Sequence, residues 1–207
     1  MVPATAKGEA TRAFLLRTAG RVFAERGYVG TTMADLIAAS GLTKGAFYFY
    51  FRSKSDLALA VLADQKNRWL DQIGNRVLTH PRAADQLDAL MPAMLELIAT
   101  DAGAWSVTRL TRELATDPAL AGSVGEPMAE WVAMIADIVR RGQAEGDLRA
   151  GLDPDDVAVV LVAAFDGLKS SSDILDGAQA GARFPDRARA LERLVLLALR
   201  EPGPTGP

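Results

Sequence analysis

Apolar residues recur three and four positions apart along almost the whole 207-residue chain, and no segment keeps up an alternation of apolar and polar residues. That spacing places apolar side chains on one face of an α-helix, whereas a half-buried strand needs strict alternation. We therefore predict an all-α fold with about nine helices. The expected helices span residues 10–26, 33–41, 43–50, 53–78, 82–100, 104–116, 123–145, 154–175 and 185–200.

Residues with known preferences for helix ends support several of these limits. Gly27 follows the first helix, as a helix C-terminus prefers. The Thr31–Thr32 pair offers an N-cap for the second helix, and Ser53 offers one for the fourth, with Asp56 three residues later. The Asp153–Pro154 pair is a strong helix start. Breaks between the later helices carry Gly103, Pro118, Gly146, Gly177 and Gly181.

The first 52 residues differ in organisation from the rest of the chain. They predict three helices, two of them short and joined by a tight turn at Gly41, which is the outline of a helix-turn-helix unit. We expect a head at residues 1–52, in which 1–9 form a disordered tail. A helical body at 53–200 and a second disordered tail at 201–207 complete the expected organisation.

Charge is distributed unevenly between these two parts. The chain has a net charge of −3, but residues 1–56 carry eight Lys or Arg and four Asp or Glu, a net of +4. The remainder therefore carries a net charge of −7. A basic head on an acidic body favours a polyanionic partner for the head.

Several classes of chemistry have little support in the sequence. The chain has no cysteine and one histidine, His80, so we expect no disulfide, no metal site and no cofactor. Asp153, Asp155 and Asp156 cluster at a helix start, where acidic side chains favour the helix dipole. Because no nucleophile–base pair or phosphate-binding loop stands out, we do not expect an enzyme.

The longest apolar run, residues 157–165, is too short to cross a bilayer, which requires roughly 20 residues. The first ten residues lack the apolar segment of a secretory signal. We therefore expect a cytoplasmic protein.

The stretch "GLTKGAFYFYF", residues 41–51, contains five of the 13 aromatic residues of the chain. If residues 43–50 form a recognition helix, its first residues enter the major groove of DNA. Lys44 then reaches a phosphate or a guanine edge, Gly45 lets the helix approach closely, and Ala46 touches a thymine methyl group. Thr43 caps the helix.

The five rings of this stretch are predicted to divide between two roles. Phe47 and Phe51, four residues apart, share a face that we assign to the core of the head. Tyr48 and Tyr50 are predicted to donate to phosphate oxygens. Phe49 lies between the two faces, and we expect it to be exposed against sugar or a thymine methyl. The alternative is that all five rings are core, although alternate residues of a helix point apart.

Residues 27–62, "GYVGTTMADLIAASGLTKGAFYFYFRSKSDLALAVL", resemble the DNA-binding head of the TetR family of bacterial repressors. The matching positions are Gly27, Tyr28, Thr31, Thr32, Gly41, Thr43, Lys44, Gly45, Tyr48, Tyr50, Phe51, Lys54 and Leu57. Leu42, Phe47 and Phe49 depart from the family pattern. The resemblance implies DNA contacts at Thr32, Thr43, Lys44, Tyr48, Tyr50 and Lys54.

The body resembles the same family more weakly, over residues 140–168. The resemblance implies a homodimer formed by the helices at about 154–175 and 185–200, which would bind a near-palindromic operator as a repressor. The alternative is that these apolar helices form an ordinary monomer core. "TKGAFYFYF" and the Glu130–Trp131 pair are similar to the γ-butyrolactone receptors within the family.

The middle helices are expected to hold a small apolar ligand, since methionine and tryptophan suit an adaptable cavity. The candidate lining residues are Met91, Met94, Trp105, Arg109, Met128, Trp131, Ile135 and Phe165. Thr108, Asp166 and Ser170 are alternatives to Arg109 as polar anchors. Two other interpretations stay open: the apolar candidates are plain core, or the dimer has no small ligand and is controlled by a protein partner or by its abundance.

Overall fold

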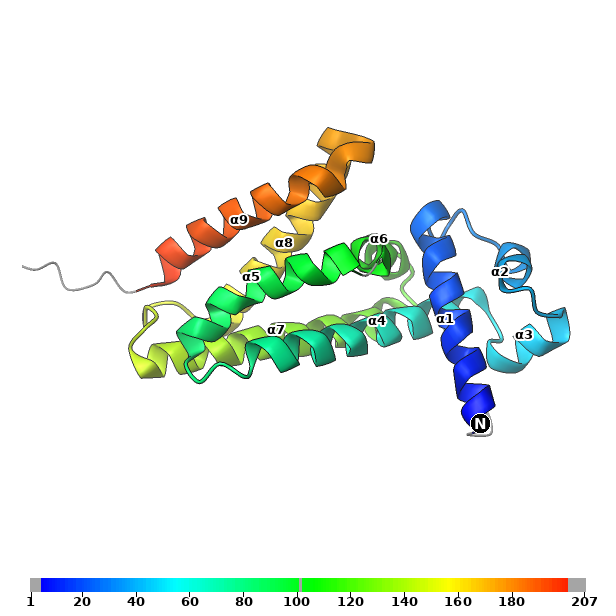
Figure 1. Cartoon of the computed structure of the whole chain (residues 1–207), viewed down its shortest axis with the longest axis horizontal. Coiled ribbons are helices and arrows are strands. Elements are labelled where there is room, and N and C mark those ends of the chain that lie inside the picture. The colour runs from blue at the N-terminus through cyan, green and yellow to red at the C-terminus, as the bar shows by residue number, and fades with distance from the viewer. Residues whose placement is uncertain (1–4, 101, 201–207) are drawn as a thin grey trace, which may run out of the picture. The chain divides into compact units, whose positions relative to one another are not determined.

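In a computed structural model, the protein is described at residues 5–100 and 102–200, without the side chains at 102–106, 127 and 178. The described residues form nine α-helices and one 3-10 helix, which confirms the predicted all-α class (Figure 1). The helices are α1 (Ala6–Arg26), α2 (Met33–Ser40), α3 (Lys44–Tyr50), α4 (Lys54–Val77), α5 (Ala83–Thr100), α6 (Ala102–Ala115), α7 (Ala121–Glu145), α8 (Pro154–Asp176), η1 (Gly177–Gln179) and α9 (Ala180–Leu199). Within residues 5–100 and 102–200, no helix has the length and apolar character needed to cross a bilayer.

The chain divides into two compact units. The head unit comprises Met1–Arg68 and Thr100–Pro127, and the body unit comprises Trp69–Ala99 and Met128–Pro207. The head unit is therefore larger than the three helices expected at 1–52. The reason is that α6 packs against α1, and its Leu110 and Leu114 are buried in the head core.

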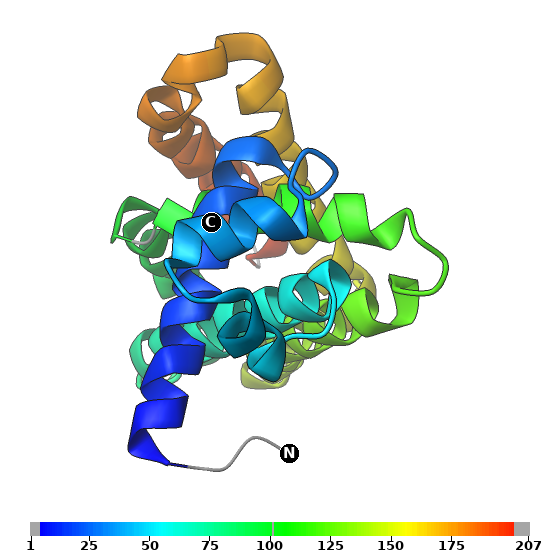
Figure 2. The same ribbon diagram turned by 90° about the vertical axis from the view of Figure 1, so that its right-hand side faces the viewer.

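The core of the head unit closes around the three N-terminal helices. Dark blue α1 lies beside α2 and α3, drawn in lighter blue and cyan (Figures 1 and 2). Phe47 and Phe51 of the aromatic stretch are buried, as predicted, together with Phe23 and Leu36. Two turns between these helices use glycine at positive φ, +75° at Gly27 and +66° at Gly41.

The largest differences from the predicted helix limits are at the starts of α1 and α9, which both begin earlier than expected. Thr5 caps α1 by accepting a hydrogen bond from the Gly8 amide at 3.2 Å, so part of the tail expected at 1–9 is helical. The last helix begins at Ala180 and contains Pro185, which was expected at its start. Pro185 removes one backbone donor, but Gly181, whose carbonyl loses that donor, is exposed to water. The break thus lies at Gly177, and Gly181 is helical.

The body unit buries one face of α8 against α9 and neighbouring helices. The buried residues of α8 follow a helical spacing: Ala158, Val162, Phe165, Lys169 and Ser172. The rings of Phe165 and Phe184 meet edge to face, with centroids 5.4 Å apart. Arg187 of α9 pairs with Asp176 at the end of α8 and donates to the Ser172 hydroxyl at 2.9 Å.

Candidate nucleic-acid interface

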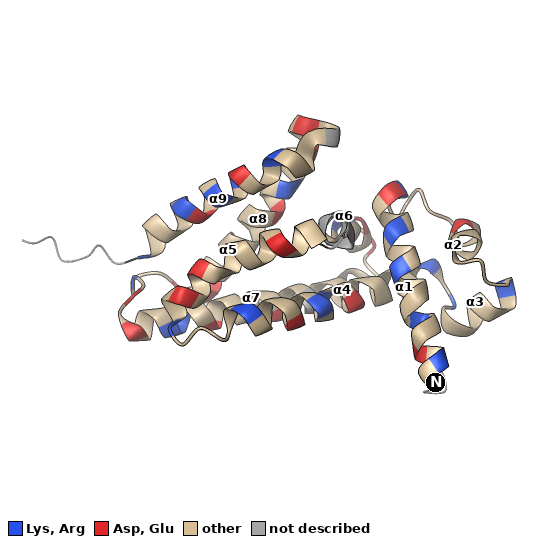
Figure 3. Cartoon of the chain, viewed as in Figure 1, with Lys and Arg blue, Asp and Glu red and all other residues tan. Residues whose placement is uncertain are grey.

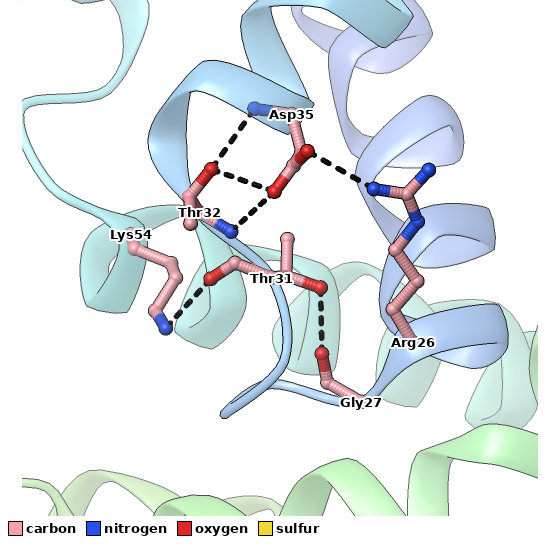
Figure 4. Close-up of polar contacts among 6 residues, drawn as sticks. All are labelled: Arg26, Gly27, Thr31, Thr32, Asp35 and Lys54. Carbon is pink, nitrogen blue, oxygen red and sulfur yellow. Dashed lines mark hydrogen bonds and ion pairs between the residues drawn. The ribbon is translucent and has the colours of Figure 1, made fainter.

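The helix-turn-helix begins at a capping box around Thr32 (Figure 4). The Thr32 hydroxyl accepts from the Asp35 amide at 3.2 Å and donates to the Asp35 carboxylate at 2.6 Å, and the carboxylate also accepts from the Thr32 amide at 2.9 Å. Arg26 donates to the same carboxylate at 3.0 Å. These hydrogen bonds, chiefly that of the Thr32 side chain, lower the pKa of Asp35.

The turn before this helix, residues 27–31, is held by a cation from α4. The Lys54 ammonium donates to the carbonyl oxygens of Tyr28 and Thr31, both at 2.8 Å, and lies 4.2 Å from the centroid of the Tyr28 ring. The Thr31 hydroxyl is buried and donates to the Gly27 carbonyl at 2.6 Å. Two of the three donors of Lys54 thus bind within the head, whereas its expected contact with phosphate stays a prediction.

The same turn is held from α6 by an anion. The Glu113 carboxylate accepts from the amides of Tyr28 and Val29 at 2.5 and 3.2 Å. One turn earlier on α6, Arg109 donates to the carbonyl oxygens of Phe23 and Ala24 at the C-terminal end of α1, both at 2.8 Å. The Arg109 guanidinium therefore lies in the head unit and is bound to α1, and its expected contact with a ligand stays a prediction.

The recognition helix α3 presents its N-terminal half to solvent. Thr43 caps it by accepting from the Ala46 amide at 3.3 Å, and Lys44, Gly45 and Ala46 are exposed. Beyond them, Tyr48 is 39% exposed and Phe49 is 58% exposed, whereas Phe47 is buried. The predicted exposure of Phe49 is confirmed, and the alternative in which all five rings are core is wrong.

Tyr50 and Lys54 are the less accessible members of the predicted DNA-binding set. Tyr50 is half-buried and packs on the head core, with the ring of Phe49 edge-on to it at 5.3 Å. Thr32 is exposed, but its hydroxyl and amide are both bound to Asp35. Phosphate contacts at these three positions stay predictions.

Basic residues of α1 and of the segment after α3 add to this surface. Figure 3 shows basic positions recurring along α1 and one at the start of α3. Arg12 of α1 is exposed and lies 5.6 Å from the centroid of the Phe51 ring, and exposed Arg52 follows Phe51, the C-cap of α3. Arg12 and Arg52 entered the predictions only through the net charge of the head. What marks both as candidates for DNA contact is that each lies next to a residue of the aromatic stretch.

The predicted ligand residues fall mostly in the body unit. Met94, Ile135 and Phe165 are buried, and Met91, Met128 and Trp131 are half-buried. The side chain of Trp105 lies outside the described residues. Two further residues of the body unit lie near these candidates: Trp69 packs edge-on against Trp131, and Lys169 lies on the buried face of α8. In the sequence, Lys169 stands out because it occupies a position in the mainly apolar stripe of α8.

The short helix α3 follows a tight turn after α2 and exposes Lys44, Gly45, Tyr48 and Phe49. This arrangement is typical of a helix-turn-helix DNA-binding protein. Residues 15–61 match the model of the bacterial regulatory proteins of the TetR family, and residues 83–188 match the tetracyclin repressor-like C-terminal domain. The chain therefore belongs to the TetR family. It is a DNA-binding transcriptional regulator and not an enzyme.

Similar proteins come from several bacteria. The chain is 30% identical over 162 residues to the HTH-type transcriptional repressor Rv1474c of Mycobacterium tuberculosis, covering 77% of this chain and 80% of that protein. It is 24% identical to the A-factor receptor protein of Streptomyces griseus, over 91% of this chain and 63% of that protein. The crystal structure of native TylP, a TetR regulator from Streptomyces fradiae, covers 95% of this chain and 89% of its own, with 32% identity and a TM-score of 0.75.

Proposed function

We propose that this regulator is a repressor that binds a near-palindromic operator as a homodimer and leaves it when a small apolar ligand binds the body unit. The observation that carries the DNA-binding part is the exposed face of α3, from Thr43 to Phe49. Buried Phe47 anchors the other face of the same helix in the head core. Thr43, Lys44, Gly45, Ala46, Tyr48 and Phe49 are the proposed reading surface. A repressor of this kind acts in the cytoplasm, where the DNA lies.

Apolar side chains on α8 and α9 support the homodimer. Although the two helices pack on each other, both leave large apolar residues exposed: Val159, Val160, Ile174, Leu175, Leu194 and Leu197. Large apolar residues exposed along two neighbouring helices are typical of an interface, and a second copy of this chain is the proposed occupant. An isologous dimer presents two α3 helices, which fit half-sites roughly 34–36 Å apart.

A γ-butyrolactone-like signal is the proposed ligand. The similarity to the A-factor receptor protein supports it, as does a 30% identical structure with a TM-score of 0.77 whose subject is the control of antibiotic production by bacterial hormones. The ligand would favour a body conformation in which α4 is displaced. A coupling free energy of about 1–3 kcal/mol would change operator affinity about 5- to 150-fold. A dimer without a small ligand is the second candidate.

Selection of bound duplexes from a random DNA pool tests the DNA-binding proposal. The expected product contains two inverted half-sites whose centres lie about one helical turn, or a multiple of it, apart. Binding to that product should weaken steeply as salt rises, because phosphate contacts release counterions. Recovery of no enriched sequence, or of an enriched site without two-fold symmetry, would contradict the proposed dimeric operator complex.

A further inference from the structure

Trp69, in the body-unit part of α4, carries a buried donor with no acceptor. Its indole Nε1 is inaccessible to solvent and has no hydrogen-bond partner among the described residues. An indole nitrogen can only donate, so only a hydrogen-bond acceptor, such as a carbonyl or carboxylate oxygen, satisfies it. Buried donors are almost always paired in native proteins, which makes this N–H a candidate contact for a ligand.

A second indole lies against the first. The rings of Trp69 and Trp131 meet edge to face, with centroids 6.1 Å apart and planes inclined by 72°. Both residues belong to the body unit, Trp69 on α4 and Trp131 on α7. Two large rings supply an apolar surface next to the buried donor, which suits a ligand whose body is hydrocarbon.

Lys169 brings a positive charge to the same place. It is 1% exposed and occupies a position of the buried stripe of α8, between Phe165 and Ser172. Its ammonium lies 6.0 Å from the centroid of the Trp69 ring. Burying an ammonium group is costly unless it is paired, and Lys169 has an interaction within the chain. Because an ammonium has three donors, it can keep a protein partner and also donate to a ligand.

We propose that Trp69 and Lys169 bind the oxygen-bearing head of an apolar ligand, whose hydrocarbon part lies on Trp69 and Trp131. The head is either a neutral carbonyl or a carboxylate, since the indole N–H serves both and the ammonium favours the second. This inference rests on the proposed control by a ligand and adds to it the polar groups that select the ligand. It assigns no such role to Arg109.

The first test compares three probes that share one skeleton or chain length. They are γ-octalactone, which offers a neutral carbonyl; sodium octanoate, which offers a carboxylate; and butylcyclopentane, which has the lactone's ring size and butyl chain but no oxygen. Binding is followed by tryptophan fluorescence of the full chain. The wild type should bind the two oxygen-bearing probes about 3- to 10-fold more tightly than the hydrocarbon. Equal binding of the three probes, or binding of none, overturns the proposal.

Two tryptophan variants locate the donor. Trp69→Phe keeps a ring and removes the N–H, so the preference for γ-octalactone over butylcyclopentane should shrink to what Lys169 alone supplies. Trp131→Phe, the matched control, should weaken all three probes alike and keep the full preference. An undiminished preference in Trp69→Phe contradicts the assignment of the Trp69 N–H.

Lys169→Met separates the two heads and keeps the proposal testable should Trp69→Phe fail to fold. The substitution should weaken octanoate about 10-fold more than γ-octalactone, whereas Lys7→Met, at an exposed lysine of α1, should change neither. Thermal unfolding of each variant is recorded alongside. If Lys169→Met shifts the unfolding temperature but leaves the ratio of the two affinities unchanged, Lys169 is structural and the proposal fails.

Operator binding in the same samples distinguishes this inference from the proposed function. A wild type that binds operator DNA but none of the probes overturns the ligand head described here and leaves the DNA-binding function intact. A wild type whose probe binding follows the expected pattern without releasing DNA supports the site and contradicts ligand control.

Discussion

Gly45 is the residue of α3 at which the proposed contact with DNA differs most clearly from the needs of the fold. A Cβ atom built at this position meets nothing within 4 Å, so the chain itself has room for a side chain. Glycine in a helix costs about 1 kcal/mol relative to alanine. The residue is thus unfavourable for the helix and unnecessary for packing, which leaves close approach of the helix to a partner as its use.

Gly45→Ala should therefore separate stability from DNA binding. We expect the free energy of unfolding to rise by up to about 1 kcal/mol, because alanine favours the helix. Operator affinity should fall, since the new methyl group keeps α3 away from the duplex. Urea unfolding and fluorescence anisotropy with labelled operator measure the two effects. Unchanged operator affinity would show that close approach at Gly45 is not required.

Asp35 links the start of α2 to pH. Its pKa is lowered from the ordinary value of 3.8, mainly by the hydrogen bond from the Thr32 side chain, with the Arg26 charge adding to the effect. A carboxyl group with a lowered folded pKa stabilises the native state at pH above its unfolded value. That contribution is lost as pH falls through the folded pKa. Acid should therefore loosen the start of α2.

Asp35→Asn should remove this part of the pH dependence. We expect the variant to be less stable than the wild type at neutral pH, and the gap between the two to close as pH falls below about 4. The check is urea unfolding of both proteins at a series of pH values from neutral to acidic. A gap that stays constant across the series would contradict the role of the Asp35 charge. Glu25→Gln, at an exposed acid of α1, is the matched control.

The aromatic stretch marks what residue-level patterns can predict. The burial of Phe47 and Phe51 was predicted from their four-residue spacing and is confirmed. The same spacing left Phe49 between the two faces, so its exposure, which is also confirmed, did not follow from the pattern alone. The internal hydrogen bonds of Lys54 could not be predicted in this way. They depend on where the turn at 27–31 places two carbonyl oxygens, and that placement is a property of the folded head.

At the scale of elements, the turn at residues 27–31 is the junction where α4 and α6 meet the helix-turn-helix. Lys54 of α4 binds its carbonyl groups, while Glu113 of α6 binds its amide groups. Two opposite charges thus fix a five-residue turn that has no regular secondary structure of its own. Since Thr32 caps α2 directly after it, the turn sets where α2 begins.

Glu113→Ala tests the importance of this junction. We expect a loss of about 1–3 kcal/mol in the free energy of unfolding, because the Tyr28 amide is left without its acceptor and the α1–α2 turn loosens. Arg112→Ala, at the neighbouring exposed position, should stay within about 0.5 kcal/mol of the wild type. Chemical denaturation measures both. Equal stability of the two variants would show that the turn does not need its anion.

Element limits were predictable where a side chain caps a helix within an apolar pattern, as at Asp153 and Ser53. The start of a helix was not predictable where its first turns lie before the first apolar residue of the helical spacing. Thr5 caps α1 before its first buried residue, Leu15, so apolar spacing gives no sign of the first turns. In α9, Pro185 is a plausible first residue by preference, yet exposed Gly181 lets the helix start earlier.

For the whole molecule, the division into two units depends on contacts that span the sequence. Leu110 and Leu114 join a core whose other members come mostly from residues 15–62. Helical spacing shows that these leucines are buried but does not show against which helix. The fold class and family were therefore predictable from the sequence, whereas the membership of α6 in the head unit was not.

The proposed homodimer is tested by placing a charge on its apolar surface. Val160→Asp and Leu194→Asp, at positions 64% and 67% exposed, should dissociate the dimer because each would bury a carboxylate at the two-fold interface. Leu78→Asp, at an exposed leucine outside α8 and α9, should leave it intact. Sedimentation equilibrium gives the mass of each variant. Dimers that persist in both interface variants would place the interface elsewhere.

The central claim, that the exposed face of α3 reads DNA, is tested most directly by one pair of variants. Lys44→Ala removes a positive charge from α3, and Arg149→Ala removes one from an exposed position of the body unit outside α8 and α9. Anisotropy titrations with the selected operator should show affinity about 10-fold or more weaker for Lys44→Ala, with Arg149→Ala close to the wild type. Equal affinity of a folded Lys44→Ala variant and the wild type would contradict the account.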